Sequence, residues 1–154
     1  MKSAPDRDQA VLVIGYGNEL RGDDAAGPRV ATAVESLGLE DVRVLVRHQL
    51  APEISEDIAR SRAVIFVDAS VDPARAGVTI TPLSPSPSST PQAHVSDPRS
   101  LMNLAQTLFG RCPPAWLVTV PARNLGFGAE FSPETLEDVQ AAVRQIEKLI
   151  HSLR

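Results

Sequence analysis

Apolar positions along the chain follow two alternating patterns. Residues 10–14 and 63–67 are uninterrupted apolar runs rich in β-branched side chains. They are too short for helices and therefore predict strands that are buried on both faces of a sheet. Between such runs, apolar residues recur at the spacing of one helix face. The alternation predicts an α/β fold, a three-layer open and mostly parallel sheet with helices on both faces.

The remaining elements follow from the same two patterns and from helix-capping residues. Further strands are predicted at 42–46, 77–83 and 116–120, with 77–83 at an edge of the sheet. Helices are predicted from the acidic turn near Asp24 to Gly38, over 52–60, from Asp97–Pro98 to Gly110, and from Ser132–Pro133 to the end of the chain. We therefore expect one domain over residues 10–154, preceded by a flexible N-terminus at residues 1–9.

Length, charge and composition restrict the class of protein. A chain of 154 residues is long enough to bury roughly 68 to 70% of its unfolded surface. Its one cysteine, Cys112, allows neither an intrachain disulfide nor a thiolate zinc cluster. A net charge of −4 and an aromatic content of 4% argue against nucleic acid or an anionic membrane as partner. The apolar runs are too short to span a bilayer, and the N-terminus has no signal-peptide core, so we expect a cytoplasmic protein.

The polar turn after the first strand carries the first candidate chemistry. The third glycine of a dinucleotide-binding fingerprint would fall at residue 20, which is leucine. A phosphate-binding P-loop is excluded too, because Asp23 follows Gly22 where lysine is required. Paired carboxylates at Asp23 and Asp24 repel phosphate and favour a cation or a proton-transfer role. A helix-capping role for one of them remains open.

Two further polar side chains belong to the same region. Asp68 follows the strand at 63–67, and His94 comes after a loop of Pro, Ser and Thr. The carboxyl ends of parallel strands form the ligand-binding edge of an open α/β sheet. Asp24, Asp68 and His94 are thus a plausible three-ligand set for a divalent transition metal. The spacing leaves open that Asp68 is a cap or turn residue and that His94 is a solvated loop histidine.

Several motifs occur together in the order of a known family. They are Gly-Tyr-Gly-Asn-Glu-Leu-Arg-Gly-Asp-Asp at 15–24, His-Gln-Leu-Ala-Pro-Glu at 48–53, Phe-Val-Asp-Ala at 66–69, His94, and Phe-Gly-Ala-Glu-Phe-Ser-Pro at 127–133. With these motifs the chain resembles, over nearly its whole length, the maturation endopeptidases of nickel-iron hydrogenases.

The resemblance implies a specific activity. Members of this family remove a C-terminal extension from the hydrogenase large subunit once nickel has been inserted. By the resemblance, Asp24, Asp68 and His94 take the places of the catalytic, metal-contacting residues, whereas Asp23 has no ligand role. The nickel arrives with the large-subunit precursor, so no permanent cofactor is implied, although other divalent metals are able to occupy such a site.

Other interpretations remain open from the sequence alone. The same three residues would also serve a non-hydrolytic binding or checkpoint module that holds a metal-loaded precursor. A small-molecule-binding α/β domain, in which the aspartates are caps, is a third possibility. His48 is better interpreted as a turn residue than as part of the chemistry. Cys112 precedes Pro113 and Pro114 away from the carboxyl edge, which gives a cysteine-protease mechanism little support.

Overall fold

The computed structural model describes residues 10–71, 77–87, 97–127 and 130–154. The N-terminus at 1–9, which was expected to be flexible, lies outside these residues, and so does His94. Five strands form one sheet in the order β2-β1-β3-β5-β4. Their bounds are β1 Val11–Tyr16, β2 Val42–Arg47, β3 Ala63–Ser70, β4 Thr79–Leu83 and β5 Ala115–Pro121. Only β4 is antiparallel, paired with β5 at the edge.

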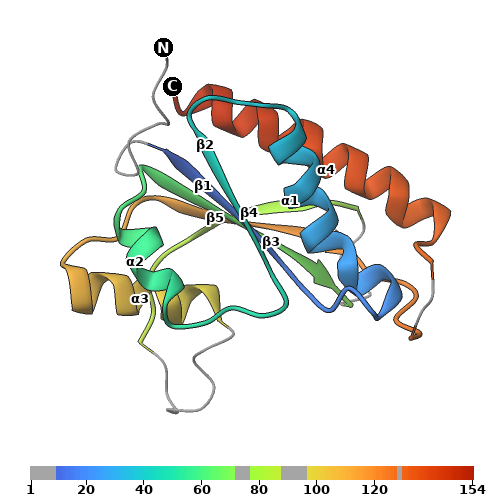
Figure 1. Ribbon diagram of the computed structural model, residues 1–154, viewed down its shortest axis with the longest axis horizontal. Helices are drawn as coiled ribbons and strands as arrows, with labels where there is room; N and C mark the ends of the chain where they lie inside the picture. Colours follow the sequence, from blue (N-terminus) through green and yellow to red (C-terminus); the bar gives the residue numbers. More distant parts are fainter. Residues whose placement is uncertain (1–9, 72–76, 88–96, 128–129) are drawn as a thin grey trace.

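Helices cover both faces of this sheet. They are the 3₁₀ helix η2 Gly22–Ala25, α1 Ala26–Ser36, α2 Ile54–Ala59, α3 Pro98–Phe109 and α4 Pro133–Ser152. Helices α1 and α4 pack against each other on one face, and α2 and α3 form the pair on the other (Figure 1). The predicted three-layer, mostly parallel α/β fold is confirmed.

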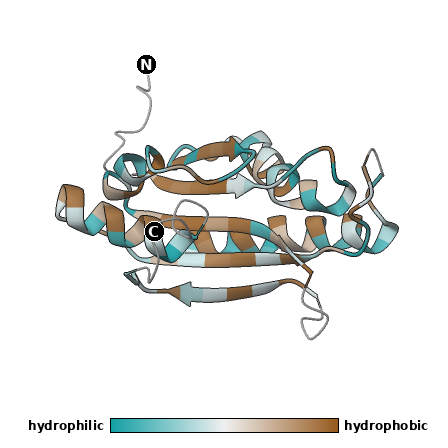
Figure 2. Ribbon diagram, turned by 90° about the horizontal axis from the view of Figure 1, so that it is seen from below, coloured by the Kyte–Doolittle hydropathy of each residue, from teal (hydrophilic) through white to brown (hydrophobic). Residues whose placement is uncertain are grey.

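The central strand β1 explains why its sequence is apolar without interruption. Val11 and Val13 point into the core beneath α1 and α4, and Leu12 and Ile14 point into the core beneath α2 and α3. All four side chains are fully buried. A strand with helices on both faces has no solvent-facing side, so polar residues do not alternate along it. The strands are accordingly mostly hydrophobic, whereas the helices mix hydrophobic and hydrophilic residues (Figure 2).

The predicted helix ends are confirmed where capping chemistry marked them. The Asp97 carboxylate accepts a hydrogen bond from the Arg99 N–H at 3.0 Å at the start of α3. Ser132 caps α4 in the same way, through a 3.4 Å bond from the Thr135 N–H. Gly110 ends α3 with a φ of 73°, the left-handed conformation that favours glycine.

The two glycines at the end of the first strand serve different purposes. The predicted strand ended at residue 14, but Gly15 still lies inside β1. A Cβ atom there would collide with the carbonyl of Gly27 and the side chain of Ala31 on α1. Glycine is therefore required so that α1 can approach the sheet closely, and the turn itself begins at Gly17, whose φ is 152°.

Strand β3 extends further than the sequence suggested. Its apolar run ends at Val67, but backbone pairing with β5 continues to Ser70, with Asp68 opposite Thr119. Asp68 therefore belongs to the rigid sheet, which fixes its position better than a loop would. Within the described part of the chain, no helix combines the length and apolar character that crossing a membrane requires.

Candidate functional site

Asp24 closes the turn that follows β1. Its Oδ2 accepts a hydrogen bond from the backbone N–H of Asn18 at 2.9 Å, and the Asn18 side chain in turn accepts one from the N–H of Leu20 at 2.9 Å. The N-cap residues of η2 and α1 are Arg21 and Ala25, and neither makes a side-chain cap bond. The helix-cap interpretation of Asp24 is therefore wrong. The carboxylate holds the turn and is only partly buried.

Asp68 lies beside Asp24 near the carboxyl end of β3. Burial raises the pKa of Asp68 to about 6. A hydrogen bond from the N–H of Ala69 opposes this rise, the negative charge of Asp24 adds to it, and a hydrogen bond from the Tyr16 hydroxyl opposes it. The two carboxylates are thus close enough for their charges to repel each other, so a cation between them would be stabilised.

Tyr16 connects Asp68 to the adjacent strand. The residue ends β1, and only 8% of its surface is exposed. Its burial raises the pKa of the hydroxyl above the ordinary value, and the charge of Asp68 and the hydrogen bond to it raise this pKa further. The hydroxyl therefore stays protonated and donates to the Asp68 carboxylate, which restricts the orientation of that carboxylate.

The structure brings together two of the three predicted site residues. Asp24 and Asp68 share the carboxyl edge, while His94 lies outside the described residues. Within the described ranges no three His, Cys, Asp or Glu side chains are grouped as a metal site. Metal binding by Asp24, Asp68 and His94 stays a prediction.

The structure gives no support to His48 or Cys112 as catalytic residues. His48 is exposed just beyond β2. Cys112 lies before β5, at the opposite edge of the sheet from Asp24. Burial raises the pKa of its thiol and the charge of Arg111 only partly offsets this, so a reactive thiolate is not favoured.

Asp23 is the residue whose role the sequence did not predict. Its carboxylate is fully buried and accepts hydrogen bonds from the backbone N–H groups of Arg123 and Asn124, both at 2.8 Å. Ser132 donates its N–H and its hydroxyl, each at 3.1 Å, and the Thr135 hydroxyl donates at 2.9 Å. These donors lie about one hundred residues further along the chain, so no local pattern could have paired them with Asp23.

These bonds join the turn that carries Asp24 to the segment between β5 and α4. Burial acts to raise the pKa of Asp23, but the hydrogen bonds from Arg123, Asn124, Ser132 and Thr135 outweigh it and hold the pKa below its ordinary value. The ionised side chain links η2, which carries Asp24, to the segment between β5 and α4. Because its oxygens are used internally, Asp23 is not available as a ligand, in agreement with the resemblance.

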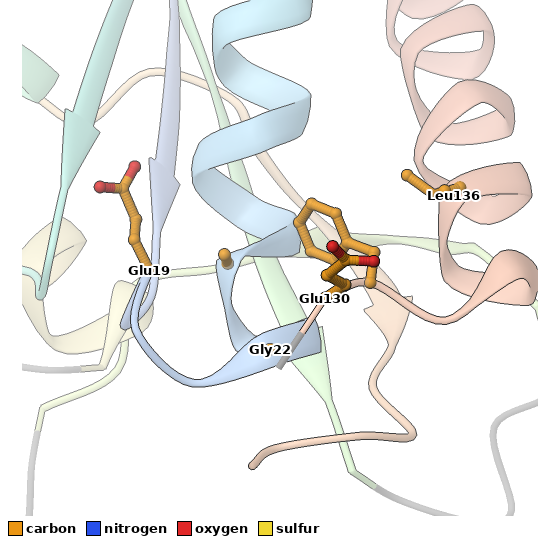
Figure 3. Close-up of a pocket in the computed structure, with 6 residues that line it drawn as sticks. Glu19, Gly22, Glu130 and Leu136 are labelled. Atoms are coloured by element: carbon orange, nitrogen blue, oxygen red, sulfur yellow. The ribbon is translucent and has the colours of Figure 1, made fainter. Parts of the chain in front are cut away.

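A pocket of about 340 Å³ lies between the same two segments. It is lined by Glu19, Gly22 and Ala25 from the β1 side and by Glu130, Phe131 and Leu136 from the α4 side. Figure 3 shows Glu19 on one side of the pocket, and Glu130 with Leu136 on the other. Its lining combines apolar side chains with two carboxylates.

Comparisons with known proteins agree on the fold. No protein-family model matches the chain, and no curated protein matches it. Among solved structures, the hydrogenase maturating endopeptidase HybD from E. coli superposes with a TM-score of 0.72, at 22% identity over 93% of each chain. The hydrogenase 2 maturation peptidase from Thaumarchaeota archaeon SCGC_AB-539-E09 gives 0.65, at 24% identity over 92% of this chain and 97% of the other. The [NiFe] hydrogenase maturation protease HycI from Thermococcus kodakarensis KOD1 gives 0.66, at 25% identity over 94% and 92%. Over nearly its whole length, the chain therefore shares the fold of the hydrogenase maturation endopeptidases, the family that its sequence motifs resemble.

Proposed function

We propose that this protein is an endopeptidase that removes the C-terminal extension of a nickel-iron hydrogenase large-subunit precursor after nickel insertion. The observation that carries the proposal is the pair of adjacent carboxylates, Asp24 and Asp68, at the carboxyl edge of a fold shared with hydrogenase maturation proteases. Ligands of open α/β sheets bind at this edge.

The proposed chemistry follows from the charge of the site. Two carboxylates that repel each other in a partly buried setting are stabilised when a divalent cation binds between them. We assign the recognition of substrate-borne nickel to Asp24, Asp68 and His94, with no permanent cofactor. The precursor is the proposed partner and the cytoplasm the proposed place of action, in keeping with the expectation from the sequence.

Cleavage of the precursor is the direct test. Incubation of the purified protein with nickel-loaded precursor should yield a shortened large subunit, and nickel-free precursor should remain intact. Asp24→Asn keeps an oxygen for the Asn18 N–H but removes one of the two charges, so we expect cleavage to fall about tenfold or more while the fold survives. The product is measured by mass spectrometry, and unfolding is followed in parallel.

The other functions predict different outcomes of the same experiment. Nickel-dependent binding without shortening would identify a checkpoint module rather than a protease. The hypothesis of a small-molecule-binding domain required the two aspartates to be helix caps. Neither Asp23 nor Asp24 caps a helix. Normal cleavage by Asp24→Asn would remove Asp24 from the proposed site.

Metal affinity should depend on pH. Burial raises the pKa of Asp68 to about 6, so its protonation competes with a bound cation, and an imidazole binds metal only in its neutral form, which an unperturbed histidine loses near pH 6.5. We therefore expect the affinity for Ni²⁺ to be constant above about pH 7 and to fall steeply below about pH 6. Calorimetric titration between pH 7.5 and pH 5 checks this. An affinity that stays flat down to pH 5 would contradict both assignments.

A further inference from the structure

The exposed hydrophobic side chains are not scattered evenly over the protein. Within the described part of the chain, the three most exposed large hydrophobic residues are Phe127, Val71 and Leu20, at 79%, 66% and 65%. Each follows one of the three neighbouring parallel strands β5, β3 and β1 on the carboxyl side. We call these three side chains the apolar rim. They occupy the same edge of the sheet as Asp24 and Asp68.

Hydrogen bonds already order the loops that carry Leu20 and Phe127 before any partner binds. Asp23 receives hydrogen bonds from Arg123 and Asn124, which lie shortly before Phe127 in the chain. The Leu20 N–H is bound to the Asn18 side chain, within the turn that Asp24 closes. A surface whose supporting backbone is already ordered loses less conformational entropy when a partner binds.

The carboxylates near the rim indicate the charge of the partner that would bind there. Asp24 and Asp68 lie at the edge that the rim occupies, and Glu19 and Glu130 flank the adjoining pocket (Figure 3). Neither Glu19 nor Glu130 is ion-paired with another described residue. A complementary partner therefore combines apolar side chains, for the rim, with positive charge, for the carboxylates.

From this arrangement we infer that the apolar rim is the docking surface for the precursor itself. A segment of the large subunit with apolar side chains packs on Leu20, Val71 and Phe127, and a lysine or arginine of the same partner faces Glu19 and Glu130. The inference rests on the proposed function and adds to it a recognition surface outside the metal-contacting residues. Exposed apolar groups that become buried at an interface contribute affinity, whereas distant carboxylates mainly steer the encounter.

The test compares a rim variant with a matched control variant. The triple change Leu20→Ser, Val71→Ser and Phe127→Ser removes the rim while leaving Asp24 and Asp68 in place. The double change Leu108→Ser and Phe109→Ser removes apolar side chains that are also exposed, at 61% and 47%, but lie at the end of α3, before β5 and at the opposite edge of the sheet. Because all five side chains are exposed, thermal unfolding should change little in either variant.

Binding and cleavage of nickel-loaded precursor are measured separately. We expect the rim variant to bind the precursor about tenfold more weakly or worse, with KM raised to match and kcat retained at saturation. Its affinity for free Ni²⁺ should be unchanged, and the control variant should behave as the wild type. Glu19→Gln with Glu130→Gln should slow association and reduce its dependence on salt.

The possible failures point to different errors. Unchanged precursor binding by the rim variant, or an equal loss in the control variant, would overturn the docking surface while the endopeptidase proposal stands. Binding by the wild type without cleavage would overturn the endopeptidase proposal, and the binding measurements would still decide the role of the rim. If the wild type neither binds nor cleaves the precursor, both proposals are wrong.

Discussion

Asp23→Asn is expected to destabilise the fold strongly although it changes no core hydrophobic residue. The carboxylate accepts five hydrogen bonds in a fully buried position, and three of the donors are backbone N–H groups that cannot turn away. In the variant, the amide NH₂ costs least where it replaces Oδ1 and faces the Ser132 N–H, and the four hydrogen bonds to the other oxygen then lose their charge assistance. Buried donors left without an acceptor cost about 1–3 kcal/mol each.

We therefore expect the free energy of unfolding to fall by about 3 kcal/mol. For a protein of this size, that corresponds to a melting temperature about 6–12 °C lower, measured by calorimetry at pH 7. A suitable control is Asp57→Asn, which removes a partly exposed carboxylate paired with Arg43 at 3.4 Å and should cost less than about 1 kcal/mol. Equal melting temperatures for the two variants would show that the hydrogen bonds of Asp23 contribute no net stability.

The pH dependence of Asp23 supplies a second check with a definite sign. Its pKa is lowered in the folded state from an ordinary value of 3.8. The stabilisation is thus complete above the ordinary value and is lost as the pH falls through the lower, folded pKa. The difference in stability between wild type and Asp23→Asn should accordingly be constant near neutral pH and shrink in strong acid.

Most of the fold could be predicted because its signals are local. The apolar run at 10–14 and the capping pairs at Asp97 and Ser132 each lie within a few residues of the element they define. The sequence-based element bounds were wrong where contacts between distant segments determine the structure. Gly15 is needed for the approach of α1 rather than for a turn, and β3 continues past Val67 because β5 continues beside it.

The candidate site could be predicted only in part for the same reason. The topology of parallel strands places Asp24 and Asp68 at one edge, so their proximity follows from the order of elements. Tyr16 and Asp23 were missed because their partners come from other strands and helices. No spacing along the chain can show that one aspartate of the pair is available at the edge while its neighbour is fully hydrogen-bonded inside.

Asp68→Asn should make the protein more stable and, under the proposed function, inactive. The folded state holds the carboxyl at a pKa of about 6 instead of 3.8, so at neutral pH its ionised form is disfavoured by burial and by the charge of Asp24. An amide of the same shape removes that charge, and its oxygen still accepts from the Ala69 N–H and the Tyr16 hydroxyl. A shift of this size corresponds to about 3 kcal/mol at most, so we expect a gain of about 2 kcal/mol, or about 4–8 °C.

The sign of the pH dependence separates this explanation from a general improvement in packing. A raised folded pKa means that the folded state binds the proton more tightly, so the destabilisation by Asp68 develops as the pH rises from about 3.8 to about 6 and is constant above. The advantage of Asp68→Asn should therefore be largest at neutral pH and absent below about pH 4, as melting curves across this range would show. In the same preparation, cleavage of nickel-loaded precursor should be lost. A variant that melts lower at pH 7 and still cleaves would show that Asp68 serves the structure alone, and the charge-repulsion site proposed for nickel would have to be abandoned.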